Sequence, residues 1–155
     1  MSIYIDFSDG PVMHNEITSK LTNQGHGAQN MFFGAVRTVN LGRNVTKIDY
    51  DLFAPLAKKV ITEICEEAIA EVGGNADVAV IHAFNTVKIG ELSIGIGVST
   101  PHRAESYDAC RYIIEEIKMR APIWKKEYYE DGETEWVQGH ALCQHNKSHN
   151  HKRSA

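Results

Sequence analysis

Basic side chains gather in one stretch of an otherwise acidic chain. The formal net charge is −4, yet residues 102–126 hold one histidine and six lysines or arginines against four acids. His102 and Arg103 fall in the first turn of a predicted helix, where the dipole disfavours cations but free N–H groups bind anions. Lys118 lies near the end of that helix, and Lys125 follows the next turn. This distribution indicates a site for an anionic ligand such as a phosphate.

A simpler interpretation of the same residues stays open. Lysines and arginines at the end of a helix commonly face solvent and complement the helix dipole. Arg37, at the end of an apolar strand, is a weak signal by itself. Taken alone, the basic residues establish only a small α+β protein with one basic patch.

Cysteine and metal chemistry are weaker candidates. Cys65 and Cys110 fall on or beside apolar helix stripes, where buried thiols are common and inert. Three widely spaced cysteines favour a reduced, cytoplasmic setting. Histidines and a cysteine near the C-terminus match no established metal-site spacing: His140, Cys143, His145, His149 and His151. We therefore predict no metal and no cofactor.

Length and composition suit one globular domain. Of the 155 residues, 43% are hydrophobic and 23% charged, and no apolar run reaches the roughly 18 residues of a membrane span. The start of the chain lacks the layout of a signal peptide. We expect one folded unit over residues 1–138 and a polar, His-rich flexible tail over 139–155.

Hydrophobic periodicity predicts an α+β fold with a mixed or antiparallel sheet and two long helices. We expect strands over 2–7, 29–37, 46–53, 77–84 and 92–99, and a short helix over 14–23. The first long helix should run from Pro55 to Val72, and the second should begin with Thr100 as its cap and Pro101 in its first turn. Five residues form the apolar stripe of the second helix: Tyr107, Cys110, Ile113, Ile114 and Ile117.

One predicted strand has a nearly bare face. In residues 92–99, bulky apolar side chains alternate with serine and glycine, including Gly95 and Gly97. Such a face permits close approach of a ligand or another chain. Tight packing of a helix on the sheet is the favoured alternative.

Four segments together resemble the catalytic (large) subunit of molybdopterin synthase. They are Phe33-Gly34-Ala35-Val36-Arg37, Asn40-Leu41-Gly42-Arg43, Ser99-Thr100-Pro101-His102-Arg103 and Lys118-Met119-Arg120-Ala121-Pro122-Ile123-Trp124-Lys125-Lys126-Glu127. Each segment alone is weak evidence for the family. Their combined order and spacing are highly specific for it, above all the run from Pro122 to Glu127. The likeness extends from about Ile3 to Val137.

The resemblance implies an α/β-hammerhead fold and a homodimer flanked by two copies of a small ubiquitin-like sulfur carrier, together a heterotetramer. The carrier's C-terminal Gly-Gly, as a thiocarboxylate, would enter a pocket and supply two sulfurs to cyclic pyranopterin monophosphate, forming the dithiolene of molybdopterin. A cation-lined pocket suits two anionic reactants. Because sulfur arrives covalently on a partner, no cysteine nucleophile is required.

The resemblance also implies roles for single residues. Lys118 and Lys125 match the two lysines regarded as catalytic, and Phe32 matches an aromatic residue of the pocket wall. Residues that match phosphate-binding positions are Arg37, His102 and Arg103. Residues inside the family's substrate-contact segments are Ala35, Val36, Lys126 and Glu127. We expect crowded cations to keep one lysine partly neutral, so that it moves protons or holds the carrier's acyl group while the other stabilises oxyanions.

The chain departs from the family pattern at two places. Many members carry His-Arg-apolar-Gly where this chain has His82-Ala83-Phe84-Asn85, which removes a basic side chain and changes a turn. His140 stands where a basic residue is frequent, which makes the charge there pH-dependent. Neither change touches the two lysines, so we expect an active enzyme.

Two other functions remain open at the level of sequence. A non-catalytic module that holds a ubiquitin-like tail or a phosphorylated small molecule would explain the basic residues but gives Lys118 no chemical task. A nucleic-acid surface is disfavoured by the net negative charge and by the absence of aromatic residues interleaved with the basic ones.

Overall fold

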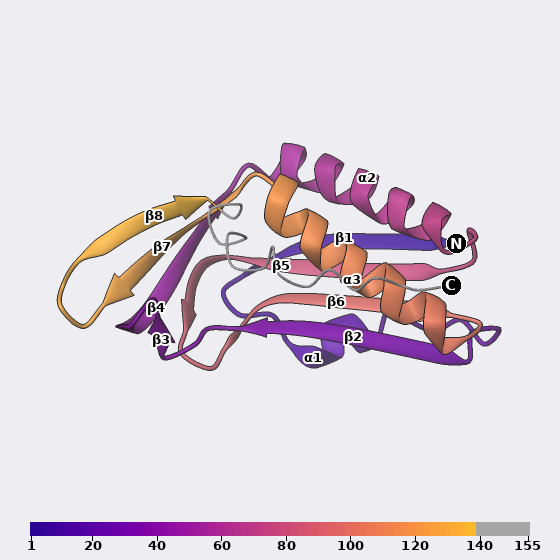
Figure 1. Cartoon of the computed structure of the whole chain (residues 1–155), viewed down its shortest axis with the longest axis horizontal. Helices are drawn as coiled ribbons and strands as arrows, with labels where there is room; N and C mark the ends of the chain where they lie inside the picture. Colours follow the sequence, from indigo (N-terminus) through magenta and orange to yellow (C-terminus); the bar gives the residue numbers. More distant parts are fainter. Residues whose placement is uncertain (139–155) are drawn as a thin grey trace, which may run out of the picture.

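The computed structural model describes residues 1–138, which form a mixed sheet with two long helices on one face (Figure 1). The α+β architecture expected from hydrophobic periodicity is confirmed, and segment 139–155 lies outside the described residues. In chain order the elements are β1 (Ser2–Asp9), α1 (His14–Thr18), β2 (Ala28–Ala35), β3 (Val39–Asn40), β4 (Arg43–Leu52), α2 (Ala54–Glu71), β5 (Asp77–Lys88), β6 (Leu92–Thr100), α3 (Arg103–Arg120), β7 (Ile123–Tyr129) and β8 (Thr134–Gln138).

One strand, β5, belongs to both halves of the sheet. The order is β2-β6-β5-β4-β7-β8, with β1 beside β5 and β3 beside β4. Residues 77–84 of β5 pair with the parallel strand β1, whereas residues 85–88 pair with the antiparallel strand β4. In Figure 1, β4, β7 and β8 accordingly swing away from the layer formed by β1, β5, β6 and β2. The two halves are thus joined through a continuous strand.

The change of partner in β5 occurs at Asn85, where the family pattern has glycine. Asn85 has a φ of 64°, in the left-handed region that asparagine tolerates better than most residues. Its side-chain amide donates to Asp9 Oδ1 at 2.8 Å. The strand therefore bends without glycine. Ala83, which stands where the family has arginine, is fully buried in the core and offers no charge.

The two long helices, α2 and α3, cover one face of the layer formed by β1, β5, β6 and β2. Ile61 and Ile64 of α2 and Ile113 of α3 are fully buried against this face, where they meet Val80 and Ile96. Burial of each such side chain contributes about 1.5–3 kcal/mol. This core holds the C-terminal end of α3 against the sheet, where the cavity described below lies. Within residues 1–138, no helix combines the length and apolar character needed to cross a membrane.

Two details of α3 differ from the sequence expectation. Its N-cap is His102 rather than Thr100, because Thr100 ends β6 and its hydroxyl donates to the carbonyl of His102 at 2.7 Å. Tyr107, expected in the apolar stripe, is 60% exposed, whereas Cys110, Ile113 and Ile117 are buried as expected.

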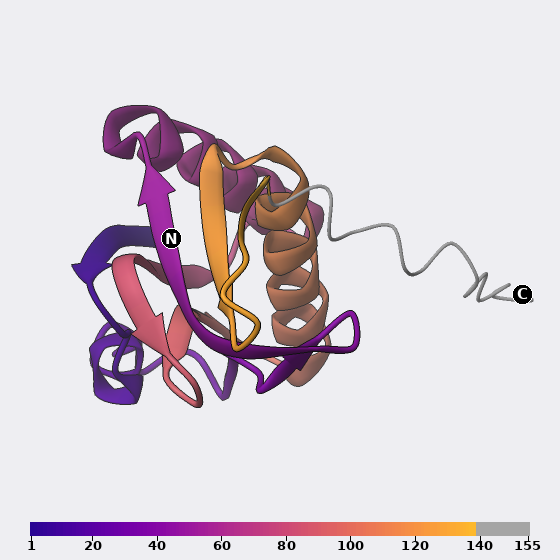
Figure 2. The same ribbon diagram turned by 90° about the vertical axis from the view of Figure 1, so that its left-hand side faces the viewer.

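The bare face of β6 is covered by the chain itself. Figure 2 shows α1 on the side of the sheet opposite α3. A Cβ atom added to Gly95 would lie 2.7 Å from Ile17 Cγ1, and one added to Gly97 would lie 2.7 Å from Ile17 Cγ2 and 2.9 Å from Leu21 Cδ1. Close helix packing is therefore the correct interpretation, and the alternative, approach of a ligand or another chain to this face, is wrong.

Gly97→Ala is expected to lower the free energy of unfolding by about 1–3 kcal/mol, because the new methyl group overlaps Ile17 and Leu21. Denaturant titration measures this change. Gly25→Ala is the matched control, since its Cβ would meet only Asn23 Oδ1 at 3.3 Å and should cost less. Equal stability of Gly97→Ala and the wild type would contradict the packing described for α1.

Candidate active site

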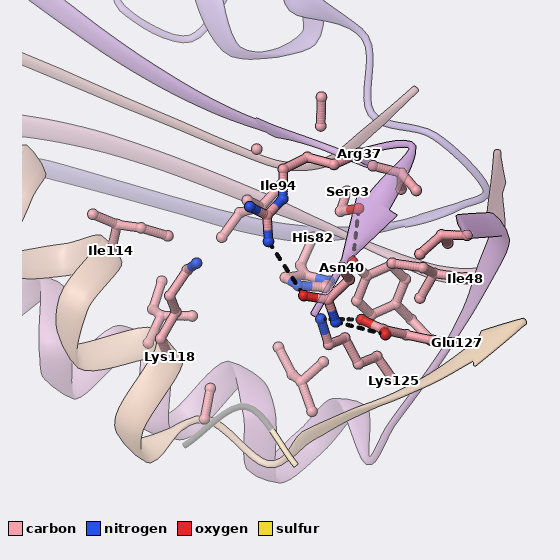
Figure 3. Close-up of a pocket in the computed structure, with 18 of the residues that line it drawn as sticks. Arg37, Asn40, Ile48, His82, Ser93, Ile94, Ile114, Lys118, Lys125 and Glu127 are labelled. Carbon is pink, nitrogen blue, oxygen red and sulfur yellow. Dashed lines mark hydrogen bonds and ion pairs between the residues drawn. The ribbon is translucent and has the colours of Figure 1, made fainter. Parts of the chain in front are cut away.

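A cavity of about 310 Å³ lies at the C-terminal end of α3, where that helix meets the sheet (Figure 3). Its wall comes from six strands, β2 to β7, from the helix α3 and from the segments that flank β3. Residues that line it include Phe32, Ala35, Val36, Arg37, Asn40, Leu41, Tyr50, His82, Ser93, Ile94, Ile114, Ile117, Lys118, Lys125 and Glu127. The cavity thus combines an apolar lining with several ionisable groups, as ligand sites commonly do.

Three cationic side chains from distant segments meet in this cavity. Arg37 follows β2, Lys118 lies in the last turn of α3, and Lys125 lies on β7. In Figure 3 their nitrogen atoms face the same space. Such a group of cations in a concave, partly apolar site attracts and orients anions.

Strand register decides which residues of β7 reach the cavity. Lys125 and Glu127 pair with Tyr50 and Ile48 of β4 and share their face of the sheet. Lys126 lies on the other face, because successive side chains of a strand alternate. Its ammonium lies 5.3 Å from the ring centre of Tyr128.

Glu127 is the centre of a buried hydrogen-bond network. Its side chain is 2% exposed, and its Oε1 lies 2.7 Å from Lys125 Nζ. Asn40 Nδ2 donates to Oε2 at 2.8 Å, and the Tyr129 hydroxyl donates to the same oxygen. Burial alone would raise the pKa of Glu127, but the hydrogen bonds from Lys125, Tyr129 and Asn40 outweigh it and lower the pKa below its ordinary value. Glu127 is therefore a carboxylate that holds Lys125 in place.

Asn40 extends this network towards Arg37. Arg37 Nη2 lies 3.4 Å from Asn40 Oδ1, while the amide nitrogen of Asn40 donates to Glu127. Lys118, in contrast, makes no ion pair or hydrogen bond with any side chain in the described part of the chain. The cavity therefore contains a fixed cation, Lys125, and a free one, Lys118.

Comparison with known proteins identifies the family of the chain. The family described as MoaE protein matches residues 7–120. The molybdopterin synthase catalytic subunit of Synechococcus elongatus is 43% identical over 150 residues, which cover 97% of this chain and 91% of that protein. The chain belongs to the MoaE family. Its members are the catalytic subunits of molybdopterin synthase, in molybdenum cofactor biosynthesis, so the family expected from the sequence is confirmed.

Solved structures support the same MoaE fold. Molybdopterin synthase from Staphylococcus aureus superposes with a TM-score of 0.76 at 31% identity, covering 88% of this chain and 95% of that one. A complex of subunits 1 and 2 of molybdopterin-converting factor from Helicobacter pylori gives a TM-score of 0.70 at 20% identity, covering 86% of this chain and 88% of that one. The second similarity shows the fold alone.

Within this MoaE chain, some of the residues expected at the site lie elsewhere. His102 and Arg103 are exposed at the N-terminal end of the 18-residue helix α3, and the cavity lies at the opposite end. Lys126 faces away from the cavity, as its register requires. Phe32, Ala35 and Val36 do line it. A single chain therefore brings together Arg37, Lys118, Lys125 and Glu127, but not the predicted phosphate contacts on α3.

Other basic residues of segment 102–126 have ordinary structural partners. Arg111 pairs with Glu115 one turn away on the surface of α3. Arg120 pairs with Glu67 of α2 and with Glu116, and so links the two helices. The simpler interpretation of the basic patch is correct for these two arginines.

His82 and Asn40 are site residues to which the sequence assigned no role. His82 lines the cavity from β5, and its ring packs edge-on against Tyr50 at 5.1 Å. The Tyr50 hydroxyl donates to Ser93 Oγ at 2.8 Å. Burial lowers the pKa of His82 to about 4, although its hydrogen bond to the carbonyl of Ala83 opposes the shift. The only sequence signals were that Asn40 lies in a segment shared with the family and that His82 matches the first residue of the family's His-Arg-apolar-Gly pattern.

The buried imidazole predicts acid-sensitive stability. An unfolded histidine binds a proton below about pH 6.5, whereas His82 stays neutral until about pH 4 in the folded chain. Protonation therefore favours unfolding, and this residue's contribution, complete above pH 6.5, should fall by about 3 kcal/mol as the pH drops to 4. Denaturant titrations of wild type and His82→Gln between pH 7 and 4 measure the difference. If acidification lowered the free energy of unfolding equally in both proteins, His82 would not be the source of the acid sensitivity.

Proposed function

We propose that this chain transfers two sulfurs from the thiocarboxylated C-terminal Gly-Gly of a small ubiquitin-like carrier to cyclic pyranopterin monophosphate, which yields the molybdopterin dithiolene. The observation that carries this proposal is the convergence of Arg37, Lys118 and Lys125 in one cavity. Both the substrate phosphate and the thiocarboxylate are anions, and cations in a partly buried site bind such groups strongly.

The environments of the two lysines support different roles. Lys118 has no partner among the described side chains, so it is free to move a proton or to take the carrier's acyl group as an amide. Lys125 is held by Glu127 at 2.7 Å, which suits a fixed positive charge that stabilises a developing oxyanion. Arg37 lines the cavity beside Ala35 and Val36, and we propose that it contacts the substrate phosphate together with these two residues.

The exchange of sulfur for oxygen needs no oxidant or reductant. For each sulfur, a C–S bond forms on the substrate and a C–O bond breaks there, and the displaced oxygen leaves as water or stays on the phosphate. Water then frees the carrier's acyl carbon, either directly from the sulfur or from the amide formed on Lys118, and the carrier leaves with an ordinary carboxylate. Neither cysteine of the described residues takes part, in agreement with the burial of Cys65 and Cys110 and with the raised pKa of both thiols, which burial causes. We propose no cofactor and a cytoplasmic location.

A second copy of the chain is part of this proposal. His102 and Arg103 contact the pterin phosphate only if another subunit presents its α3 N-terminus to the cavity, because their own cavity lies at the far end of the helix. This requirement supports a homodimer, and two carriers then complete a heterotetramer. Native mass spectrometry of the assembled complex tests the two-plus-two stoichiometry.

Incubation with thiocarboxylated carrier and cyclic pyranopterin monophosphate tests the function. We expect the carrier's mass to change by the replacement of sulfur with oxygen, and two sulfurs to appear on the pterin. Binding of both reactants without product would favour the alternative, a non-catalytic module. Salt-dependent binding of random oligonucleotides without any pterin binding would instead revive a nucleic-acid surface.

A further inference from the structure

His82 is held in one tautomer within the cavity wall. Its Nδ1 lies 2.7 Å from the carbonyl oxygen of Ala83, and a carbonyl oxygen only accepts hydrogen bonds. Nδ1 must therefore carry the proton. In the neutral ring, which burial favours, Nε2 is then an acceptor with a free lone pair.

The direction of this lone pair is fixed by the surrounding side chains. His82 shares the helix-covered face of β5 with Val78 and Val80, and it lies three residues before the bend at Asn85. Tyr50 packs edge-on against the ring at an interplanar angle of 77°. Rotation of the ring would break the bond to Ala83 inside the core, so the imidazole is a rigid part of the cavity wall (Figure 3).

The neighbouring acceptors are already in use. Glu127 accepts from Lys125, Asn40 and Tyr129, and Asn40 Oδ1 faces Arg37. The hydroxyl groups of the neighbouring tyrosine and serine bond to each other. His82 Nε2 has no hydrogen-bond partner among the described residues, although the side chain lies almost entirely within the protein. Nε2 is therefore an unpaired acceptor in the wall of the cavity, and a ligand that carries a hydrogen-bond donor can use it.

We infer that His82 is a substrate-recognition residue whose Nε2 accepts a hydrogen bond from an N–H group of the pterin ring. This inference rests on the proposed function. The cations of the cavity bind the anionic parts of the reactants, but they cannot recognise a neutral donor. His82 supplies the complementary acceptor and so orients the heterocycle relative to Lys118 and Lys125.

Nitrogen NMR of the wild-type protein labelled at histidine provides the first test, and it needs no variant. In the free protein, we expect His82 to show a protonated Nδ1 and an unprotonated Nε2. Saturation with cyclic pyranopterin monophosphate should shift the Nε2 signal in the direction of an accepted hydrogen bond. A protonated Nε2 in the free protein, or an Nε2 signal unchanged at saturation, would overturn the inference.

Two variants separate the bond to Ala83 from the bond to substrate. His82→Asn keeps a donor near the position of Nδ1 and removes Nε2, whereas His82→Gln places an amide oxygen near Nε2. We expect His82→Asn to raise the KM for the pterin about tenfold or more, with carrier affinity unchanged, and His82→Gln to stay within a fewfold of wild type. An unchanged KM in folded His82→Asn would overturn the inference.

These experiments distinguish the inference from the function on which it rests. Wild-type protein that transfers sulfur while both the Nε2 signal and the KM of His82→Asn stay unchanged would refute the role of His82 alone. Wild-type protein that shifts the Nε2 signal but transfers no sulfur would support the His82 contact and refute the proposed catalysis. If both variants fail to fold, the wild-type NMR titration decides.

Discussion

Lys118→Ala is expected to abolish sulfur transfer while leaving the carrier bound. Lys118 is the cavity cation without a partner among the described side chains, so its removal leaves no group to move the proton or to hold the acyl carbon. General acid–base and electrostatic contributions of this kind are each worth roughly a hundredfold or more, and their combined loss should reduce kcat by at least about a thousandfold. Single-turnover mass spectrometry measures the rate, and calorimetry measures carrier affinity.

Two further variants make this result specific. Lys118→Arg keeps the charge but neither loses its proton nor forms the amide, so we expect it to be almost as inactive as Lys118→Ala. Arg111→Ala removes a cation from an exposed position of the same helix, where the side chain is 80% accessible, and should leave activity unchanged. Near-normal rates for Lys118→Ala would rule out a catalytic role, and full activity of Lys118→Arg would reduce that role to electrostatics.

Glu127→Gln is expected to reduce both stability and activity. The change leaves Lys125, whose side chain is only 15% exposed, without its counter-ion, and it replaces one acceptor oxygen by an N–H group that must face either Lys125 or the donors Asn40 and Tyr129. Removing one partner of a buried ion pair commonly costs 3–5 kcal/mol. Because Lys125 borders the cavity and regains some hydration there, we expect about 2–3 kcal/mol. The displaced ammonium should lower kcat at least about tenfold.

The double variant Lys125→Met with Glu127→Gln separates the two effects. Removing both charges eliminates the unpaired cation, so stability should recover substantially relative to Glu127→Gln. Activity should remain low, because the fixed charge is missing. Denaturant titration and turnover measured on the same preparations provide the comparison. Recovery of activity together with stability would show that Glu127 and Lys125 only maintain the fold.

The family motifs predicted cations that the structure brings together, and strand register explains why Lys126 does not line the same cavity. Arg37, Lys118 and Lys125 were assigned from motif segments far apart in the sequence, and the structure places them in one cavity. Lys126 was assigned from the same run as Lys125. Adjacent residues of a strand face opposite ways, and only the pairing of β7 with β4 shows which lysine faces the cavity.

The remaining differences arise where tertiary contacts override a local preference. Thr100 has the chemistry of a helix cap, but the ladder of β6 extends through it and its hydroxyl is used locally. The alternation of residues over 46–53 predicts that Thr46, Ile48 and Tyr50 share one face of the strand. Ile48 and Tyr50 do share a face, but a bulge after Val45 buries that residue and leaves Thr46 exposed. No periodicity distinguishes His82, a polar residue in an apolar strand, from a core histidine, because its function depends on which side chains surround it.

The continuity of β5 has a consequence for how ligands enter. Strand β5 carries His82 and then pairs with β4, which pairs in turn with β7, the strand of Lys125. The walls that these strands form can therefore separate only if backbone hydrogen bonds on both sides of Asn85 break. The part of the cavity wall that these strands form is therefore preorganised, and binding requires little ordering of their backbone. We therefore expect the ligand to adapt its conformation on binding more than these strands do.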